Sequence, residues 1–173
     1  MNKYQQIAKR IVTASRVLDV GCGAGDLGRS LNGKQCNVTG WDLKLDRVNA
    51  NREAYQLLEE HDIETQGFGS KKYDVIVSNP PYIELLNFKY LEKDIVNFEP
   101  KLALSGGFDG FSEIKKVIKK ASRLIKKNGK FILEIGFNQK NRVIDKLKKE
   151  GFYINKAIKD YGNNDRCIIS TKI

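Results

Sequence analysis

The stretch VLDVGCGAG, residues 17–25, decides the fold of this chain. Its first four residues are a short apolar run, typical of a buried strand. The glycines that follow predict a tight turn. Residues 26–31 then indicate the beginning of a helix, with Leu27 and Leu31 on one face. A strand that passes through a glycine turn into a helix is the opening unit of an α/β sheet.

Strand and helix patterns alternate along the rest of the chain. We expect further strands at 36–42, 62–66, 73–78, 130–135, 152–158 and 166–171, and helices at 3–13, 46–60, 111–127 (ended by Asn128-Gly129) and 139–150. This alternation predicts a mostly parallel sheet covered on both faces. The last two strands, joined by turn-forming residues 162–165, should form an antiparallel edge. The prediction is a Rossmann-like α/β fold with a seven-stranded sheet in one domain, 1–173, whose first 15 residues hold a short helix.

The composition is that of a globular domain, with 40% hydrophobic and 30% charged residues among 173. No apolar stretch is long enough to span a membrane, and no signal sequence is evident, which favours the cytoplasm. The three cysteines form no CxxC pair, so neither a zinc site nor a disulfide framework is expected. His61, the only histidine, is interpreted as a solvated loop residue.

The net charge of +10 has two interpretations. A basic protein is attracted to polyanions, so a weak contact with the ribosome or a nucleic acid is one of them. The other is a solvated surface, because many lysines fall on the outer faces of predicted helices. The second interpretation is favoured slightly, and the first stays open.

The glycine turn also predicts a cofactor site. In an open parallel sheet, ligands bind at the carboxyl ends of the strands, and glycines let the backbone approach a ligand closely. The order Asp19-x-Gly21-x-Gly23-x-Gly25 fits the S-adenosylmethionine form of this turn better than the dinucleotide form G-x-G-x-x-G. Asp19 would then face the methionine ammonium, and Asp42 would accept hydrogen bonds from the ribose hydroxyls. The alternative is that Asp19 and Asp42 are only a turn former and a helix cap.

Asn79-Pro80-Pro81-Tyr82 follows a predicted strand directly and is the sharpest chemical signal. Two prolines fix the backbone and remove two N–H donors, which leaves a wall rich in carbonyl acceptors. Such a wall suits a planar NH₂ group, with one hydrogen donated to the Asn79 side chain and the other to the Pro80 carbonyl, while Tyr82 stacks on the plane. Alignment of nitrogen, methyl and sulfur would supply much of the rate. Adenine, cytosine and glutamine all carry such a group.

With these motifs the chain resembles the HemK (PrmC) family of protein glutamine-N5 methyltransferases. The resemblance runs from Val17 to Arg166 and includes four elements beyond the shared NPPY. They are VLDVGCGAG, the segment 98–110 that resembles EP-x-x-AL-x-GG-x-DG, Leu133-Glu134-Ile135-Gly136 with Gln139, and the stretch DYGNNDR at 160–166, which resembles the family's C-terminal D-x-x-G-x-x-R.

The resemblance implies a class I methyltransferase fold, S-adenosylmethionine as cofactor, S-adenosylhomocysteine as product and no metal. The residues implied to contact the cofactor or substrate are Asp19, Gly21, Cys22, Gly23, Ala24, Gly25, Asp42 and Asn79. Asn79, Pro80, Pro81 and Tyr82 would hold the glutamine. The implied substrate is the Gly-Gly-Gln loop of a peptide chain release factor. Alternatives are a ribosomal protein or an exocyclic amine of DNA or RNA.

Two departures from the family pattern bear on these implications. The family usually carries a helical N-terminal docking domain, and only about sixteen residues precede the first predicted strand here. The loop after the third strand usually offers the adenine an acidic or aromatic residue. With that strand placed at 62–66, the loop near Gln66 carries no acid, and Phe68 is the remaining candidate for the adenine contact.

Overall fold

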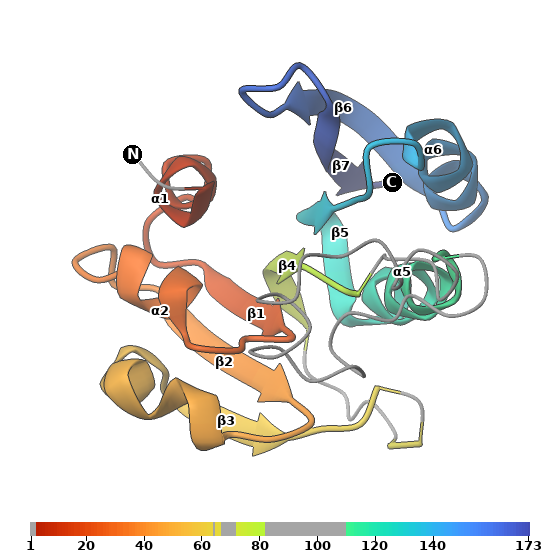
Figure 1. The fold of residues 1–173 in the computed structure, drawn as a ribbon. Helices are drawn as coiled ribbons and strands as arrows, with labels where there is room; N and C mark the ends of the chain where they lie inside the picture. Colours follow the sequence, from red (N-terminus) through yellow and green to blue (C-terminus); the bar gives the residue numbers. More distant parts are fainter. Residues whose placement is uncertain (1–2, 64, 67–71, 82–109) are drawn as a thin grey trace, which may run out of the picture.

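The computed structural model describes residues 3–63, 65–66, 72–81 and 110–173. Within these residues, seven strands form one sheet with helices on both faces (Figure 1). The strands are β1 (Arg16–Val20), β2 (Asn37–Asp42), β3 (Leu57–Glu60), β4 (Tyr73–Ser78), β5 (Ile125–Glu134), β6 (Phe152–Lys159) and β7 (Asp165–Lys172). The helices are α1 (Lys3–Ala8), α2 (Asp26–Ser30), the 3-10 helix η1 (Asp46–Ala54), α5 (Ser112–Leu124) and α6 (Lys140–Lys149).

The strand order in the sheet is β3-β2-β1-β4-β5-β7-β6. β1 pairs in parallel with β2 on one side and with β4 on the other, and β3 and β5 extend the parallel pairing outward. β7 runs antiparallel to both β5 and β6, which confirms the predicted antiparallel C-terminal pair. The strand order reverses between β1 and β4, and ligands bind outside the carboxyl ends of the strands at such a point.

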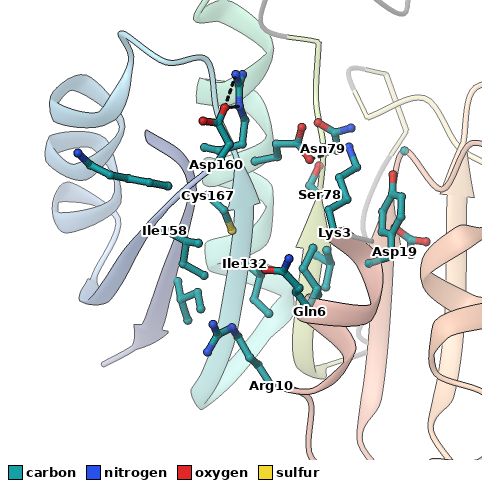
Figure 2. Close-up of a pocket in the computed structure, with 18 of the residues that line it drawn as sticks. Lys3, Gln6, Arg10, Asp19, Ser78, Asn79, Ile132, Ile158, Asp160 and Cys167 are labelled. Carbon is teal, nitrogen blue, oxygen red and sulfur yellow. Dashed lines mark hydrogen bonds and ion pairs between the residues drawn. The ribbon is translucent and has the colours of Figure 1, made fainter. Parts of the chain in front are cut away.

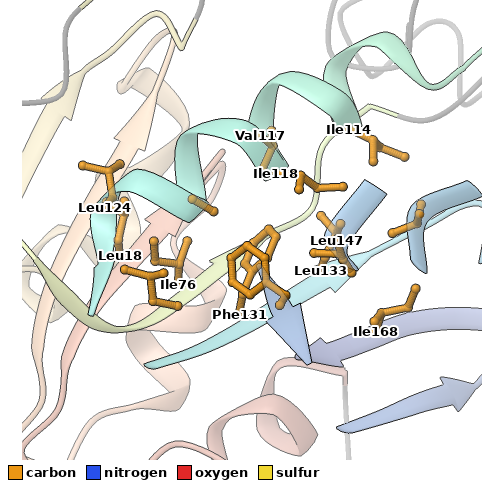
Figure 3. Packing of buried hydrophobic residues seen from close by; sticks show 14 of the residues in the cluster. Leu18, Ile76, Ile114, Val117, Ile118, Leu124, Phe131, Leu133, Leu147 and Ile168 are labelled. Carbon is orange, nitrogen blue, oxygen red and sulfur yellow. The ribbon is translucent and has the colours of Figure 1, made fainter. Parts of the chain in front are cut away.

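Apolar layers cover both faces of the sheet. On one face, α5 packs on β4 and β5, and α6 packs on β6 and β7. Ile114 and Ile118 of α5 join Ile76, Phe131 and Leu133 in one buried cluster (Figure 3). Apolar residues three and four apart place this stripe of α5 on the sheet. On the other face, a second buried cluster joins α1 and α2 to the same strands. β1 and β4 are therefore packed from both sides, which fixes the position of their carboxyl ends.

The third strand lies earlier in the chain than the sequence predicts. The expected helix 46–60 ends at Ala54, and the expected strand 62–66 is instead β3, at Leu57–Glu60. Tyr55 turns the chain into an extended conformation, with φ −113° and ψ 134°. Leu57 then pairs with Thr39 of β2. The predicted helix extended to Glu60. Pairing with β2 makes residues 57–60 a strand instead.

α1 and α5 also end earlier than predicted. α1 stops at Ala8 rather than at residue 13, because the buried Ile11 packs into the core from a turn after the helix. α5 stops at Leu124, so Asn128-Gly129 is not its cap. Those two residues lie inside β5, with Asn128 in the left-handed region at φ 64°. None of the helices in the described part of the chain is long and apolar enough to cross a lipid bilayer.

Candidate functional site

The carboxyl ends of β1 and β4 lie side by side. Val20 is opposite Ser78 in the sheet, and the Ser78 hydroxyl donates a hydrogen bond to the Val20 carbonyl at 3.0 Å. Gly21 and Asn79 are the next residues of the two strands, and a Cβ atom added to Gly21 would lie 3.9 Å from the Asn79 carbonyl oxygen. The predicted glycine turn and the predicted Asn-Pro-Pro corner are therefore neighbours.

Three glycines of the turn have left-handed backbone. φ is +74° at Gly21, +51° at Gly23 and +79° at Gly25, a region that residues with a Cβ rarely adopt. A Cβ atom at Gly25 would also lie 2.9 Å from the Cβ atom of Asn51. At Gly23, none of the described residues comes within 4 Å of an added Cβ atom. The turn is thus packed at its Gly25 end and open at Gly23.

Cys22 and Ala24 lie between these glycines. Cys22 is buried, and burial raises the pKa of its thiol to about 12, so it remains a neutral packing group. Ala24 is exposed, and its carbonyl accepts a hydrogen bond from the Asn51 side chain at 2.7 Å.

Asp19 is buried in β1 and bonded to a residue that the sequence analysis missed. Its carboxylate accepts a 2.7 Å hydrogen bond from the Tyr55 hydroxyl, which in turn accepts one from the Gly28 backbone N–H at 3.2 Å. Burial raises the pKa of Asp19 to about 7, although the Tyr55 hydrogen bond acts in the opposite direction. Asp19 also lines the cavity described below. It is thus more than a turn former, because it is a buried carboxyl facing a cavity.

The raised pKa of Asp19 predicts a pH-dependent contribution to stability. Between about pH 4 and pH 7 the folded protein holds this proton more tightly than the unfolded chain, so the contribution is complete below pH 4 and is lost as pH rises through 7. At about 1.4 kcal/mol per pKa unit, the loss amounts to a few kcal/mol. Asp19→Asn keeps an acceptor for Tyr55 without a titrating group. Urea unfolding across this range should therefore show the variant gaining stability relative to the unsubstituted protein, and parallel curves would contradict the assignment.

Asp42 ends β2 and holds the open part of the glycine turn. Its Oδ2 atom accepts a hydrogen bond from the Gly23 backbone N–H at 2.8 Å. It is partly exposed and does not cap a helix. The structure places it beside the turn, as predicted, although it does not line the cavity that contains Asp19.

The corrected position of β3 changes the residues beside Asp42. The loop after β3 now begins at His61, whose backbone N–H donates to the Asp42 carbonyl at 2.8 Å. Asp62 follows at once, so the acid that seemed to be missing from this loop is present. His61 is not a solvated loop residue as predicted: its ring stacks on Trp41 with centroids 3.8 Å apart. Burial, followed by the charge of Lys120, lowers its pKa.

Asn79, the first residue of the Asn-Pro-Pro corner, lines a cavity of about 610 Å³ between α1 and the carboxyl ends of β1, β4 and β5. Asp19, Gly21 and Asn79 line it together with residues of α1 and of the β6–β7 turn (Figure 2). Pro80 is buried and Pro81 is partly buried, as expected for a rigid wall. The predictions for Tyr82, Phe68 and the segment 98–109 lie outside the described residues.

Two motif residues near the C-terminus have structural positions. The Gln139 side chain is buried; it accepts from the Gly136 N–H at 2.9 Å and donates to the Gly110 carbonyl at 2.7 Å. It thereby joins the loop after β5 to the segment just before α5. Arg166 binds Asp160 through two nitrogens, at 3.2 and 3.0 Å, across the turn between β6 and β7. Arg166 and Asp160 both line the cavity.

The chain is similar in sequence to known methyltransferases. A protein named release factor glutamine methyltransferase from Fusobacterium nucleatum is 35% identical over 172 residues, covering 94% of this chain and 49% of that protein. A protein of the same name from Shewanella oneidensis is 34% identical, covering 88% of this chain and 56% of the relative. The chain thus spans about half the length of these curated relatives.

The fold and the family model agree with this similarity. A methyltransferase from Pyrococcus furiosus superimposes with a TM-score of 0.67 at 21% identity, over 97% of this chain and 81% of that one. A ribosomal protein L11 methylase from Lactobacillus delbrueckii gives 0.68 at 16% identity, over 98% and 77%. The fold is that of the class I methyltransferases. A family model described as a methyltransferase domain matches residues 11–167. The chain therefore belongs to the methyltransferase domain family.

Proposed function

We propose that this domain transfers a methyl group from S-adenosylmethionine to the side-chain amide nitrogen of a glutamine, in the Gly-Gly-Gln loop of a peptide chain release factor. The observation that carries the proposal is the adjacency of Gly21 and Asn79 at the edge of one cavity. The names of the relatives support the choice of glutamine and of a release factor.

The residues of the turn fit the proposed cofactor. Asp19 is a buried carboxyl, and its pKa is raised. The ammonium group of the cofactor's methionine part, placed beside it, would lower this pKa and offset the cost of burying the carboxylate. The open side of Gly23 gives close access to the backbone. Asp42 anchors the turn and can accept from ribose hydroxyls. Asp62 is our candidate for the adenine contact, in place of the earlier candidate Phe68.

When bound, the cofactor supplies an electrophilic methyl group on a sulfonium. The protein then has to orient an amide nitrogen, which is a weak nucleophile because its lone pair is delocalised. Asn79 Oδ1 and the Pro80 carbonyl each accept one N–H of the glutamine amide, and the prolines contribute no competing donors. Acceptors aimed at these hydrogens also stabilise positive charge that develops on nitrogen. Tyr82 remains the predicted stacking partner of the amide plane.

The experiment that tests the proposal is transfer of labelled methyl from S-adenosylmethionine to purified release factors, with peptide mass mapping of the product. We expect one methyl group on the glutamine of the Gly-Gly-Gln loop, and no transfer when that glutamine is replaced by alanine. Ribosomal proteins, DNA and RNA serve as parallel acceptors. Labelling of nucleic acid, which the net charge of +10 would assist, or of another protein site would overturn the choice of substrate.

Asp42→Ala should mainly weaken cofactor binding. It removes the acceptor for the Gly23 N–H and for the proposed ribose contact. A hydrogen bond to a charged group is worth about 1.5–3 kcal/mol, which corresponds to roughly a tenfold to hundredfold loss of affinity. Isothermal titration with S-adenosylhomocysteine measures the change. Asp46→Ala, an exposed carboxylate in the same connection, is the matched control and should bind normally; equal affinities for both variants would exclude the role of Asp42.

A further inference from the structure

Glu134 reaches the Asn79 side chain from the neighbouring strand. Ser78 of β4 is paired with Leu133 of β5, so Asn79 and Glu134, the next residue of each chain, lie next to each other. In the amide orientation that satisfies its neighbours, Asn79 Nδ2 donates to Glu134 Oε1 at 3.3 Å. Asn79 Oδ1 then accepts from Lys3 Nζ at 3.3 Å.

Lys3 and Glu134 are themselves paired, with 2.9 Å between Lys3 Nζ and Glu134 Oε2. The Glu134 side chain is 12% exposed, whereas that of Lys3 is 48% exposed. All three residues line the cavity, with Lys3 extending from α1 toward Asn79 (Figure 2). Glu134 is thus held in the sheet, and Lys3 approaches from the more exposed side.

An asparagine amide can present either its oxygen or its nitrogen, because the two ends have nearly the same shape. Only the oxygen can accept an N–H of the substrate; a rotated amide would set two donors against each other. An ionised carboxylate is purely an acceptor, so it binds the NH₂ end of Asn79 and repels the oxygen end. Glu134 therefore selects the orientation in which Oδ1 faces away from it.

The position of Lys3 agrees with this orientation. Its ammonium stands 3.3 Å from Asn79 Oδ1, so the acceptor end of the amide faces a donor on the cavity side. A substrate N–H needs the same acceptor. Lys3 keeps Glu134 Oε2 as a partner when Oδ1 is taken by another donor.

We infer that Glu134 is a positioning residue for methyl transfer: it fixes the Asn79 amide so that Oδ1 points to the acceptor nitrogen. The inference rests on the proposed function for its rate consequences. It predicts that Glu134 influences the transfer step through Asn79. Nothing in the sequence pattern alone assigns this task, since Glu134 is one residue of a strand end.

Kinetics of Glu134→Ala and Glu134→Gln give the first test. Glu134→Ala should lower kcat roughly tenfold to a hundredfold, with unchanged affinity for S-adenosylhomocysteine, because a misaligned group costs rate and not cofactor binding. Glu134→Gln retains an oxygen that accepts from Asn79 Nδ2 and should recover part of the loss. Glu150→Ala, which removes a similarly half-buried carboxylate paired with Lys146 at 2.5 Å, is the control and should turn over normally.

A double substitution isolates the route. Alanine at position 79 has no amide for Glu134 to orient, and it adds no charge beside the Glu134 carboxylate. Adding Glu134→Ala to Asn79→Ala should therefore change kcat by less than about twofold, whereas independent effects would multiply. The same penalty in both backgrounds, or a Glu134→Ala variant with unchanged kcat, would overturn the inference.

An amide spectrum tests the inference without turnover. In protein labelled with ¹⁵N-asparagine, the side-chain NH₂ signals that disappear in Asn79→Asp belong to Asn79. They should shift in Glu134→Ala and stay in place in Glu150→Ala. Unshifted signals in Glu134→Ala would overturn the hydrogen bond itself.

If the unsubstituted protein transfers no methyl group, the proposed function fails, and this spectrum still decides the role of Glu134. If turnover of Asn79→Ala is too slow to measure, the comparison of Glu134→Ala with Glu134→Gln and the spectrum decide.

Discussion

Replacing Asn79 with alanine should lower turnover by roughly a hundredfold to a thousandfold, the range found when one group that stabilises transition-state charge is removed. The alanine variant lacks the side-chain acceptor for the substrate N–H but keeps the Pro80 carbonyl. Asn79 is proposed to bind the substrate amide and not the cofactor. The loss should therefore appear in kcat, and the affinity for S-adenosylhomocysteine should stay close to its original value. Single-turnover transfer to a release factor measures the effect.

The control for this prediction is Asn138→Ala. Asn138 is an exposed asparagine in the loop that follows β5, so its loss removes an amide near the same edge of the sheet without touching the corner. It should leave turnover unchanged. Full activity of Asn79→Ala would mean that another group holds the amide nitrogen, and a loss confined to cofactor affinity would move Asn79 from the substrate to the cofactor.

Tyr55→Ala should destabilise the fold by about 3–5 kcal/mol, as large-to-small substitutions of buried aromatic residues do. The ring fills the space left by glycines on two elements: a Cβ atom at Gly28 would lie 2.4 Å from it, and one at Gly40 would lie 2.9 Å from it. Tyr55→Phe retains this packing but leaves the Asp19 carboxylate without its donor and the Gly28 N–H without its acceptor. It should cost about 1–3 kcal/mol.

Urea unfolding of the two variants separates packing from hydrogen bonding. Both unfolding midpoints should fall, and that of Tyr55→Ala should fall further. The phenylalanine variant should also raise the pKa of Asp19, because the hydrogen bond that lowers it is gone. Equal stability of Tyr55→Phe and the unsubstituted protein would show that the Asp19–Tyr55–Gly28 chain of hydrogen bonds contributes nothing net.

The fold could be predicted from periodicity wherever an element carries its own pattern. β1, β4 and the C-terminal pair were predicted nearly to their ends, because apolar runs bounded by glycine or proline mark buried strands. β3 was misplaced because its alternation is short and half polar, and its strand character comes from pairing with β2. A single-sequence pattern does not contain that tertiary contact.

The site residues could be predicted where a sequence motif lies at a strand end. They could not be predicted where a side chain reaches the site from another element of the fold. Gly21 and Asn79 could be expected to meet, since parallel strands bring their carboxyl ends to one edge. Tyr55 and Glu134 could not, because each acts through a contact that only the folded sheet creates. The glycines at 28 and 40, which have no turn to make, were the available signal for a large neighbouring ring. The proposed role of Asp62 could not be considered from the sequence, because the third strand was predicted at 62–66.

The most direct measurement is a crystal structure of the domain with a non-reactive S-adenosylmethionine analogue and a Gly-Gly-Gln peptide. We expect the glutamine amide nitrogen to lie about 3–3.5 Å from the atom that replaces the transferable methyl. Its two N–H groups should donate to Asn79 Oδ1 and to the Pro80 carbonyl. An amide bound away from Asn79, or a donor atom turned away from that corner, would contradict this expectation.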